Sequence, residues 1–240
     1  MESKKNEIIE LNFKPVGLVE QISAIMTDLI LEGKIESGKQ LVEAELQKQL
    51  GTSRSPIRES FRILEKQGLV EFVPRKGVFV KSETRKDIEE RFPVRAVLEG
   101  LAAREALGKF TKTDLDKMKT EFKKMETSLK KDDLRMYKEV HFEFHEIFIN
   151  ASQNELLINL LKPLRLKGKW SNYSQQYFRE DIHEILEVHR TILELFEGEC
   201  SETQRDKVES VVRNHIESAV TDYLNYFEIQ EKENRKSKPL

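Results

Sequence analysis

The sequence predicts a mainly α-helical protein of two parts, a mixed N-terminal part with a β-hairpin and a C-terminal all-α bundle of about six helices. Only 10 glycines and 6 prolines occur in 240 residues, so helix-breaking residues are scarce. Six of the ten glycines lie in residues 1–82, and apolar side chains recur at helical spacing through the rest. We therefore expect a first domain over residues 1–82, a second over residues 83–232, and a disordered tail over residues 233–240.

The composition excludes several classes of protein. The 41 basic and 43 acidic side chains give a net charge of −2, so nucleic-acid binding requires a local basic patch. No apolar run approaches the roughly 20 residues of a membrane-spanning helix, and the N-terminus has no apolar signal core, so we expect a cytoplasmic protein. A single cysteine, Cys200, rules out an internal disulfide and a CxxC zinc site. The phosphate loops GxGxxG and GxxxxGK[ST] are absent, and we predict no catalytic residues.

The first two predicted helices are short and amphipathic. Gly33 ends the first helix, and a turn at residues 36–38 separates it from the second, over residues 42–50. On the second helix, Leu46 and Leu50 lie on one side. The apolar residues that predict the first helix recur at helical spacing: Leu18, Ile22, Ile25, Leu29 and Ile30.

A third helix and a hairpin complete the N-terminal part. The helix follows a tight turn at residues 51–53 and runs to about Gln67, with Pro56 in its first turn, where the missing N–H is harmless. Its inward face consists of Ile57, Phe61 and Leu64. Its opposite face consists of Arg54, Ser55, Arg58 and Arg62. Two β-type runs, residues 69–73 and 78–81, flank the sequence PRKG and form a hairpin with a basic tip.

This order of elements is typical of a winged helix-turn-helix, which binds double-stranded DNA. Within residues 54–81, seven basic side chains outnumber three acidic ones. The first residues of such a helix meet base edges in the major groove, where arginine binds guanine or phosphate. At the hairpin tip, Arg75 and Lys76 reach the DNA backbone or the minor groove, and Gly77 permits close approach. The alternative is that some of these arginines form only solvated ion pairs along a helix.

Residues 18–81 resemble the DNA-binding domain of the GntR family of bacterial transcription regulators. The segment GTSRSPIRESFRILEKQGLV, residues 51–70, reproduces the turn, the recognition helix and the start of the wing of that family without a gap. The resemblance implies that Arg54 and Arg58 are the leading DNA contacts. It also implies secondary contacts from Ser53 and Ser55, and a contact of the wing from Lys76 and Gly77.

The C-terminal part contains helical patterns without a strand pattern, which predicts an all-α bundle. Thr113 and Asn154 are predicted caps, and Gly108 and Gly198 are predicted stops. The predicted helices cover residues 87–107, 113–131, 133–150, 154–169, 177–198 and 204–229.

Four of the five histidines lie on apolar helix faces. His141 and His145 are four residues apart, and His189 and His215 lie on the apolar stripes of two later helices, whereas His183 lies off its stripe. A buried polar group without a partner costs about 1–3 kcal/mol. One shared divalent metal satisfies four imidazoles together, because imidazole nitrogen suits Zn, Ni, Cu and Fe. The alternative is four core histidines that each form a local hydrogen bond.

The C-terminal part resembles the helical ligand-binding domain of the FadR subgroup of GntR regulators, called FCD. The resemblance is carried by FPVRAVLEGLAAREAL (92–107), FHEIFINASQNELL (144–157), VHRTILELFEG (188–198) and VRNHIESAV (212–220). It implies that His145, His189 and His215 are metal ligands, and that His141 stands where metal-binding members carry aspartate. Four neutral imidazoles leave the charge of the ion uncompensated, which favours Zn or Ni and an anionic ligand.

The resemblance implies a small organic acid as effector. Arg95 is the first candidate to hold its carboxylate; the alternative is a plain ion pair between Arg95 and Glu99, four residues further on. Arg165 and Tyr173 are further candidates.

The expected function is a ligand-responsive transcription regulator, and a repressor in particular, that binds palindromic operator DNA as a homodimer. Two other classes stay open. A helical-bundle metalloenzyme is disfavoured because only one Glu-x-x-His motif, residues 180–183, is present and HExxH is absent. The second class is a metal-free sensor, or an adaptor that uses the bundle only to dimerise. In that class the histidines have a structural role.

Overall fold

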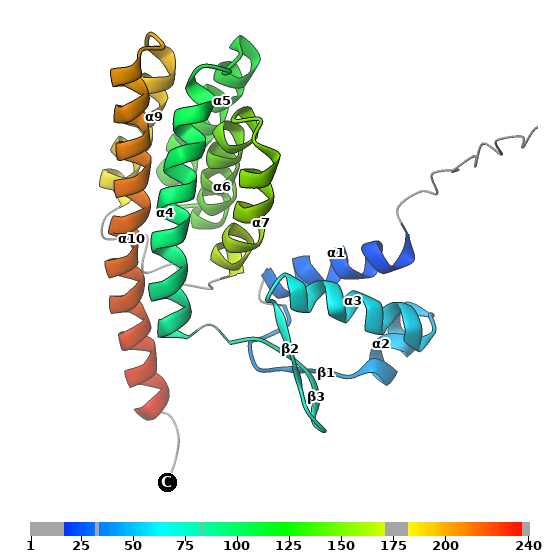
Figure 1. The fold of residues 1–240 in the computed structure, drawn as a ribbon. Coiled ribbons are helices and arrows are strands. Elements are labelled where there is room, and N and C mark those ends of the chain that lie inside the picture. The colour runs from blue at the N-terminus through cyan, green and yellow to red at the C-terminus, as the bar shows by residue number, and fades with distance from the viewer. Residues whose placement is uncertain (1–16, 32–33, 83, 171–181, 237–240) are drawn as a thin grey trace, which may run out of the picture. The chain divides into compact units, whose positions relative to one another are not determined.

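A computed structural model describes residues 17–31, 34–82, 84–170 and 182–236. The chain forms two compact units, Met1–Lys81 and Ser82–Leu240 (Figure 1). The first is a helix-turn-helix with a small sheet and the second is all-helical, as the sequence predicts. No helix among the described residues is long and apolar enough to cross a membrane.

The N-terminal unit combines three helices with a three-stranded antiparallel sheet in the order β1-β3-β2, and α3 packs between the other two helices and β2. Its helices are α1 (Leu18–Leu31), α2 (Glu43–Leu50) and α3 (Arg54–Lys66), and its strands are β1 (Gln40–Leu41), β2 (Val70–Val73) and β3 (Gly77–Val80). Ile57, Phe61 and Leu64 of α3 are fully buried, which confirms the predicted inward face of this helix.

Not every apolar residue that predicts α1 is buried in the structure. Ile22, Met26 and Ile30 are buried, whereas Leu18 is 52% exposed and Ile25 is 49% exposed. At 100° per residue, Ile25 lies about 100° around the helix from the centre of the buried stripe. The stripe that contacts α3 is therefore spaced by four residues, and an apolar side chain off that stripe stays in water.

Strand β1 has only two residues, too few to leave a pattern in the sequence. It pairs with β3, placing Gln40 opposite Phe79 and Leu41 opposite Val78. The side-chain amide of Gln40 donates a hydrogen bond of 2.7 Å to the carbonyl oxygen of Lys76. The strand therefore holds the turn of the wing from the side.

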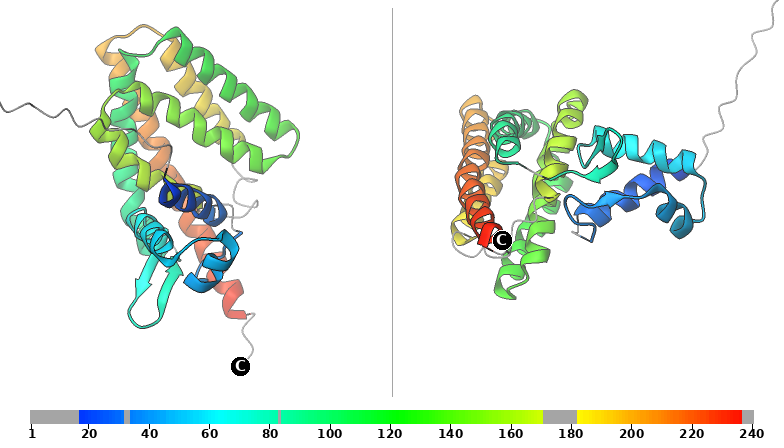
Figure 2. Two further views of the ribbon diagram at one scale, coloured as in Figure 1. Left: turned by 90° about the vertical axis from the view of Figure 1, so that its right-hand side faces the viewer. Right: turned by 90° about the horizontal axis from the view of Figure 1, so that it is seen from below.

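The described residues of the C-terminal unit form six helices, in agreement with the predicted bundle (Figure 2). The helices are α4 (Arg85–Leu107), α5 (Lys112–Lys130), α6 (Leu134–Ala151), α7 (Glu155–Trp170), α9 (Ile182–Glu197) and α10 (Glu202–Lys236). Their core is rich in phenylalanine and leucine, with Phe144 and Phe148 of α6 at its centre.

Two predicted helix ends are wrong. The cap of α5 is Thr111, whose hydroxyl accepts from the backbone of Asp114 in a reciprocal capping box; Thr113 lies inside the helix. Helix α10 continues to Lys236, so residues 233–236 are helical and do not belong to a disordered tail. The charged residues there favour helix, and no glycine or proline interrupts them. The predicted cap Asn154 is confirmed, because its side-chain oxygen accepts from the backbone of Leu157 at 3.1 Å.

Helices α4 and α10 lie side by side along most of the unit (Figures 1 and 2). Gly100 allows this approach, because a Cβ atom there would lie 2.9 Å from the backbone oxygen of Glu209. The close packing brings Glu99 of α4 and His215 of α10 to the same region of the core, where α6 and α9 add further polar side chains.

Candidate functional site

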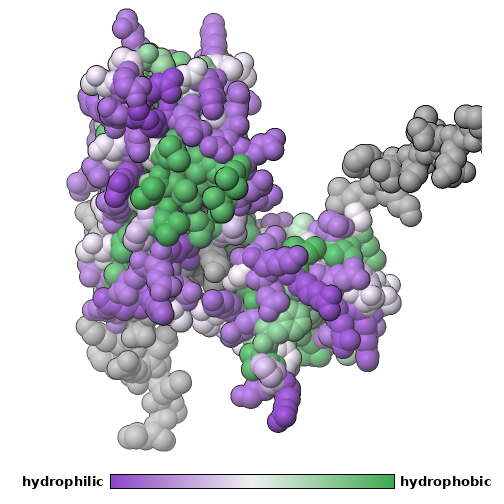
Figure 3. All heavy atoms as spheres, in the orientation of Figure 1, coloured by the Kyte–Doolittle hydropathy of each residue, from purple (hydrophilic) through white to green (hydrophobic). Residues whose placement is uncertain are grey.

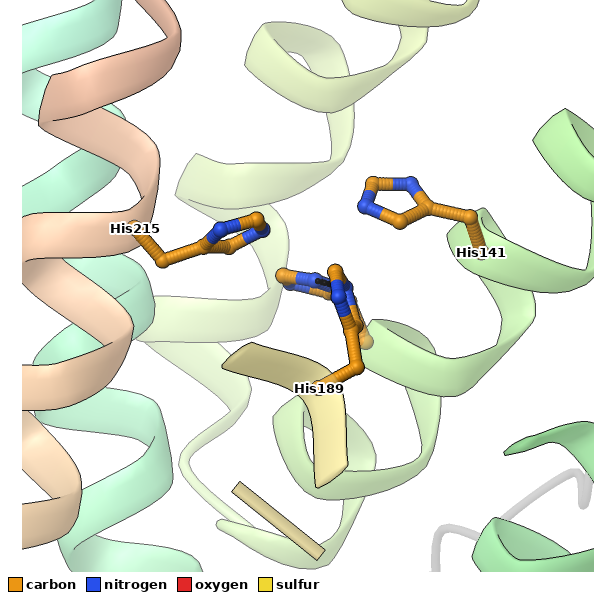
Figure 4. A group of neighbouring side chains, drawn as sticks. His141, His189 and His215 are labelled. Atoms are coloured by element: carbon orange, nitrogen blue, oxygen red, sulfur yellow. Dashed lines mark hydrogen bonds between the residues drawn. The ribbon is translucent and has the colours of Figure 1, made fainter. Parts of the chain in front are cut away.

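Four imidazole rings meet in the interior of the helical unit. His141 and His145 come from α6, His189 from α9 and His215 from α10. Each offers one ring nitrogen such that the four atoms lie within 4.8 Å of one another. Figure 4 shows His141, His189 and His215 pointing toward a common point. These four residues form the histidine cluster, whereas His183 is exposed.

The outer nitrogens of two rings determine which nitrogens face the centre. His145 Nδ1 lies 2.9 Å from Oε2 of Glu99, and His189 Nδ1 lies 2.7 Å from the backbone oxygen of Ile185. Both partners accept hydrogen bonds, so both Nδ1 atoms carry the hydrogen. The two Nε2 atoms then carry lone pairs and face one another at 3.1 Å.

The short distance between these two Nε2 atoms fits two ligands of one metal ion. Two nitrogens that bind one zinc ion tetrahedrally, each at about 2.05 Å, are about 3.3 Å apart. A hydrogen bond between the two Nε2 atoms would require one ring to move its hydrogen from Nδ1, and that ring would lose its outer partner. The geometry therefore satisfies the N–H donors of His145 and His189 and directs the lone pairs of both rings toward the centre of the cluster.

The electrostatics keep the histidine cluster neutral. Burial, followed by the neighbouring imidazoles, holds the pKa values of His141 and His189 well below the usual range. Burial lowers the pKa of His215 to about 3. Burial also lowers the pKa of His145, although the hydrogen bond that its ring donates to Glu99 opposes that shift. Neutral rings offer their lone pairs at neutral pH, as metal binding requires.

A buried carboxylate adjoins the cluster, and the sequence did not reveal its role. Glu99 is 0% exposed. Its Oε1 accepts from Arg95 at 2.8 Å, and its Oε2 accepts from Arg165 at 2.8 Å as well as from His145. Burial opposes ionisation, but the guanidinium groups of Arg165 and Arg95, together with His145, hold the pKa of Glu99 well below the usual range.

Two of the three predicted effector residues, Arg95 and Arg165, therefore form ion pairs with Glu99. The ion pair between Arg95 and Glu99, the alternative considered from the sequence, is present. Arg165 also donates to Glu146 at 2.9 Å and to the backbone oxygen of Phe142 at 3.0 Å. Tyr173 lies outside the described residues. The spacing of four residues indicated the ion pair between Arg95 and Glu99 on α4. No sequence pattern links Glu99 to His145, which lies 46 residues further along the chain.

The predicted DNA-contacting side chains of α3 are exposed on one face of the N-terminal unit. Arg58 Nε donates to Glu43 at 2.7 Å, and Arg54 Nε donates to Gln47 at 3.2 Å. Both acceptors lie on α2, so the first helix of the pair orients the arginines of the second. The side chain of Ser53 forms no capping hydrogen bond. The exposed residues that were predicted on this face are Ser53, Arg54, Ser55, Arg58 and Arg62.

The tip of the wing is built from a tight turn. Arg75 and Lys76 are exposed between β2 and β3, and the exposed Gly77 begins β3. Arg75 has a φ of 63° and Gly77 has a φ of 112°, a value that strains any residue with a side chain. A Cβ atom at position 77 would also lie 3.0 Å from Nε2 of the side-chain amide of Gln40. The backbone angle and the contact with Gln40 therefore both favour glycine at position 77.

Comparison with known proteins agrees with both units. Residues 18–80 match the model of bacterial regulatory proteins of the gntR family, and residues 90–218 match the FCD domain. The chain is 29% identical over 200 residues to an uncharacterised HTH-type transcriptional regulator, YdhC, of Bacillus subtilis (strain 168), covering 81% of this chain and 88% of the relative. It is 31% identical over 168 residues to the gluconate operon transcriptional repressor of Bacillus licheniformis, covering 67% and 68%.

The solved structure of E. coli McbR/YncC has the same fold, with a TM-score of 0.72 and 18% identity, covering 88% of this chain and 100% of that one. The relatives are transcription regulators and not enzymes. A DNA-binding unit of the gntR type is followed by an FCD unit that fits the FadR-like subgroup. The chain belongs to the GntR family of bacterial transcription regulators.

Proposed function

We propose that the protein is a metal-dependent, acid-responsive repressor that binds a palindromic operator as a homodimer. The observation that carries the proposal is the histidine cluster, four ring nitrogens within 4.8 Å in the core of the unit that follows the DNA-binding unit. Relatives named as repressors include the gluconate operon transcriptional repressor and the probable D-xylose utilization operon transcriptional repressor. The proposed DNA contacts are Ser53, Arg54, Ser55, Arg58, Arg62, Arg75, Lys76 and Gly77.

The donor set suits a divalent transition metal, Zn or Ni, bound by His141, His145, His189 and His215. Four neutral nitrogen ligands match the preference of these borderline ions for imidazole. Glu99 hydrogen-bonds to the outer nitrogen of His145, as carboxylates do beside metal-binding histidines. A bound ion supplies a Lewis-acidic centre to which an oxygen of a ligand can bind.

The charges around the cluster support an anionic effector. The carboxylates of Glu99 and Glu146 are balanced by the guanidinium groups of Arg95 and Arg165. These four charges cancel, so they leave no net negative charge to offset a bound divalent ion. Glu99 lies beside the ligands, but its charge is already balanced by the two arginines. An organic acid provides the missing negative charge, and its affinity depends on the metal.

Thermal unfolding with and without metal tests this function. Protein loaded with Zn²⁺ or Ni²⁺ is compared with chelator-treated protein, in acetate, malate or citrate and in neutral glycerol. We expect at least one acid to raise the melting temperature of the loaded protein alone, and to weaken binding to an operator selected from random DNA by about 5- to 150-fold. Equal stabilisation without metal indicates a metal-free sensor, and an absence of stabilisation by every acid contradicts the proposed effector class.

An apolar patch on the helical unit supports the homodimer. Figure 3 shows hydrophobic side chains gathered over α4 and α7. Val94 and Val97 of α4 are 48% and 47% exposed, and Leu156 and Leu160 of α7 are 70% and 49% exposed. Monomers rarely expose large contiguous apolar patches to water. A second copy of the same patch, related by twofold symmetry, covers it with matching chemistry.

Introducing charge into this patch will separate the dimer. We expect the Val97→Asp/Leu160→Asp variant to elute at the mass of one chain, 28.2 kDa, by size-exclusion chromatography with light scattering, because two desolvated carboxylates per chain oppose association. Met136→Asp on α6 changes an apolar residue of 36% exposure outside the patch and should remain dimeric. A double variant that remains dimeric excludes the patch as the interface.

A further inference from the structure

Glu99 is the buried carboxylate that contacts the histidine cluster in the described part of the chain. We propose that Glu99 is a positioning residue for the metal centre: it holds His145 in the form that carries hydrogen on Nδ1 and thereby directs the Nε2 lone pair toward the ion. This inference rests on the proposed function, because it concerns the metal that the histidine cluster binds.

In the hydrogen bond between these two residues, His145 must be the donor and Glu99 the acceptor. His145 Nδ1 lies 2.9 Å from Glu99 Oε2. The carboxylate receives hydrogen bonds from two guanidinium groups and is ionised, so it accepts and does not donate. The imidazole must supply the hydrogen from Nδ1. The remaining lone pair of the ring is then on Nε2, which faces His189 Nε2 at 3.1 Å.

Three helices hold the carboxylate in place. Arg95, one turn earlier on α4, donates to Oε1, and Arg165 of α7 donates to Oε2. Arg165 is itself anchored on α6 by Glu146 and by the backbone oxygen of Phe142. Because every side-chain oxygen of Glu99 has a cationic donor, the buried charge is compensated and its direction toward His145 is rigid.

At His189, a backbone carbonyl holds the hydrogen on Nδ1. Its Nδ1 hydrogen-bonds to the carbonyl of Ile185, one turn earlier on its own helix. That partner follows from helix geometry, whereas the partner of His145 comes from a different helix. Glu99 is therefore the place where a side-chain substitution can change the orientation of a metal ligand without removing the ligand.

Glu99→Gln tests the inference, and Glu146→Gln is the matched control. Both substitutions remove a carboxylate that Arg165 contacts, but only Glu99 contacts His145. We expect the dissociation constant for Co²⁺ to rise by about 10- to 100-fold in Glu99→Gln, with a shifted Co²⁺ absorption spectrum. In Glu146→Gln the spectrum should be that of the unsubstituted protein, and the affinity should change by less than about threefold.

A second measurement detects the position of the hydrogen in the unsubstituted protein directly. Nitrogen-15 NMR of the metal-free chain labelled in histidine should show hydrogen on Nδ1 of His145, with the resonance assigned by its loss in His145→Gln. Hydrogen on Nε2 overturns the inference, as does unchanged Co²⁺ affinity and spectrum in Glu99→Gln. Failure of the unsubstituted protein to bind Co²⁺, Zn²⁺ or Ni²⁺ overturns the proposed metal centre as well, so the two failures are distinguishable.

Discussion

The variant His189→Ala/His215→Ala will retain almost no transition metal after purification. It removes two of the four imidazoles, one from α9 and one from α10, and leaves only the pair on α6. Two nitrogens on a single helix cannot enclose an ion, whereas structural zinc sites use four protein ligands. The metal content measured by elemental analysis should therefore fall from about one ion per chain in the unsubstituted protein to near zero in the variant.

His183→Ala is the matched control, because His183 lies on α9 like His189 but is exposed. Its metal content should equal that of the unsubstituted protein. A chelator should lower the melting temperature of the unsubstituted protein and of His183→Ala, but not that of the double variant, since a metal that binds only the folded chain stabilises it. Near-zero metal in all three proteins would end the metal proposal.

Arg58→Ala will weaken operator binding by about tenfold to a hundredfold, the range for loss of one arginine contact to a base. Arg58 is 62% exposed at its side chain and is held by Glu43 of α2, so its guanidinium group is oriented at the surface before DNA arrives. The hydrogen bond and charge of Glu43 raise the pKa of Arg58, which keeps the group cationic at any pH used for DNA binding. Fluorescence anisotropy with operator and with unrelated DNA, at fixed salt, measures the change.

The control for this prediction is Arg135→Ala. Arg135 is 80% exposed and pairs with Glu139 on α6, so it is an arginine of similar exposure in the helical unit. Its loss should leave operator affinity unchanged within about threefold. An equal loss in both variants points to a nonspecific effect of charge, and no loss in Arg58→Ala removes Arg58 from the contact surface.

The elements of both units were largely predictable because each depends on neighbours in the sequence. Helical spacing predicted the inward face of α3, and two β-type runs on either side of the sequence PRKG predicted the hairpin of the wing. Such patterns failed where several faces were apolar or where an element was very short. Ile25 is exposed because α3 covers only one stripe of α1, and β1 exists because β3 lies beside it.

The histidine cluster was predictable for the same reason. His141 and His145 are one turn apart, and His189 and His215 share stripes with residues that are buried, such as Ile192 and Val212. Each helix therefore indicated by itself which way its imidazole points. Once helices bury their apolar stripes in one core, side chains on those stripes converge.

Glu99 and the apolar patch required the tertiary structure. The sequence alone determined the two-part architecture, the DNA-binding motif and the inward direction of four histidines. Only packing decided that Glu99 of α4 contacts His145 of α6, that Arg165 serves this carboxylate, and that Val97 and Leu160 face outward together. The physical reason is that periodicity specifies a direction around one helix axis, whereas a contact between helices depends on how far each slides and turns against the next.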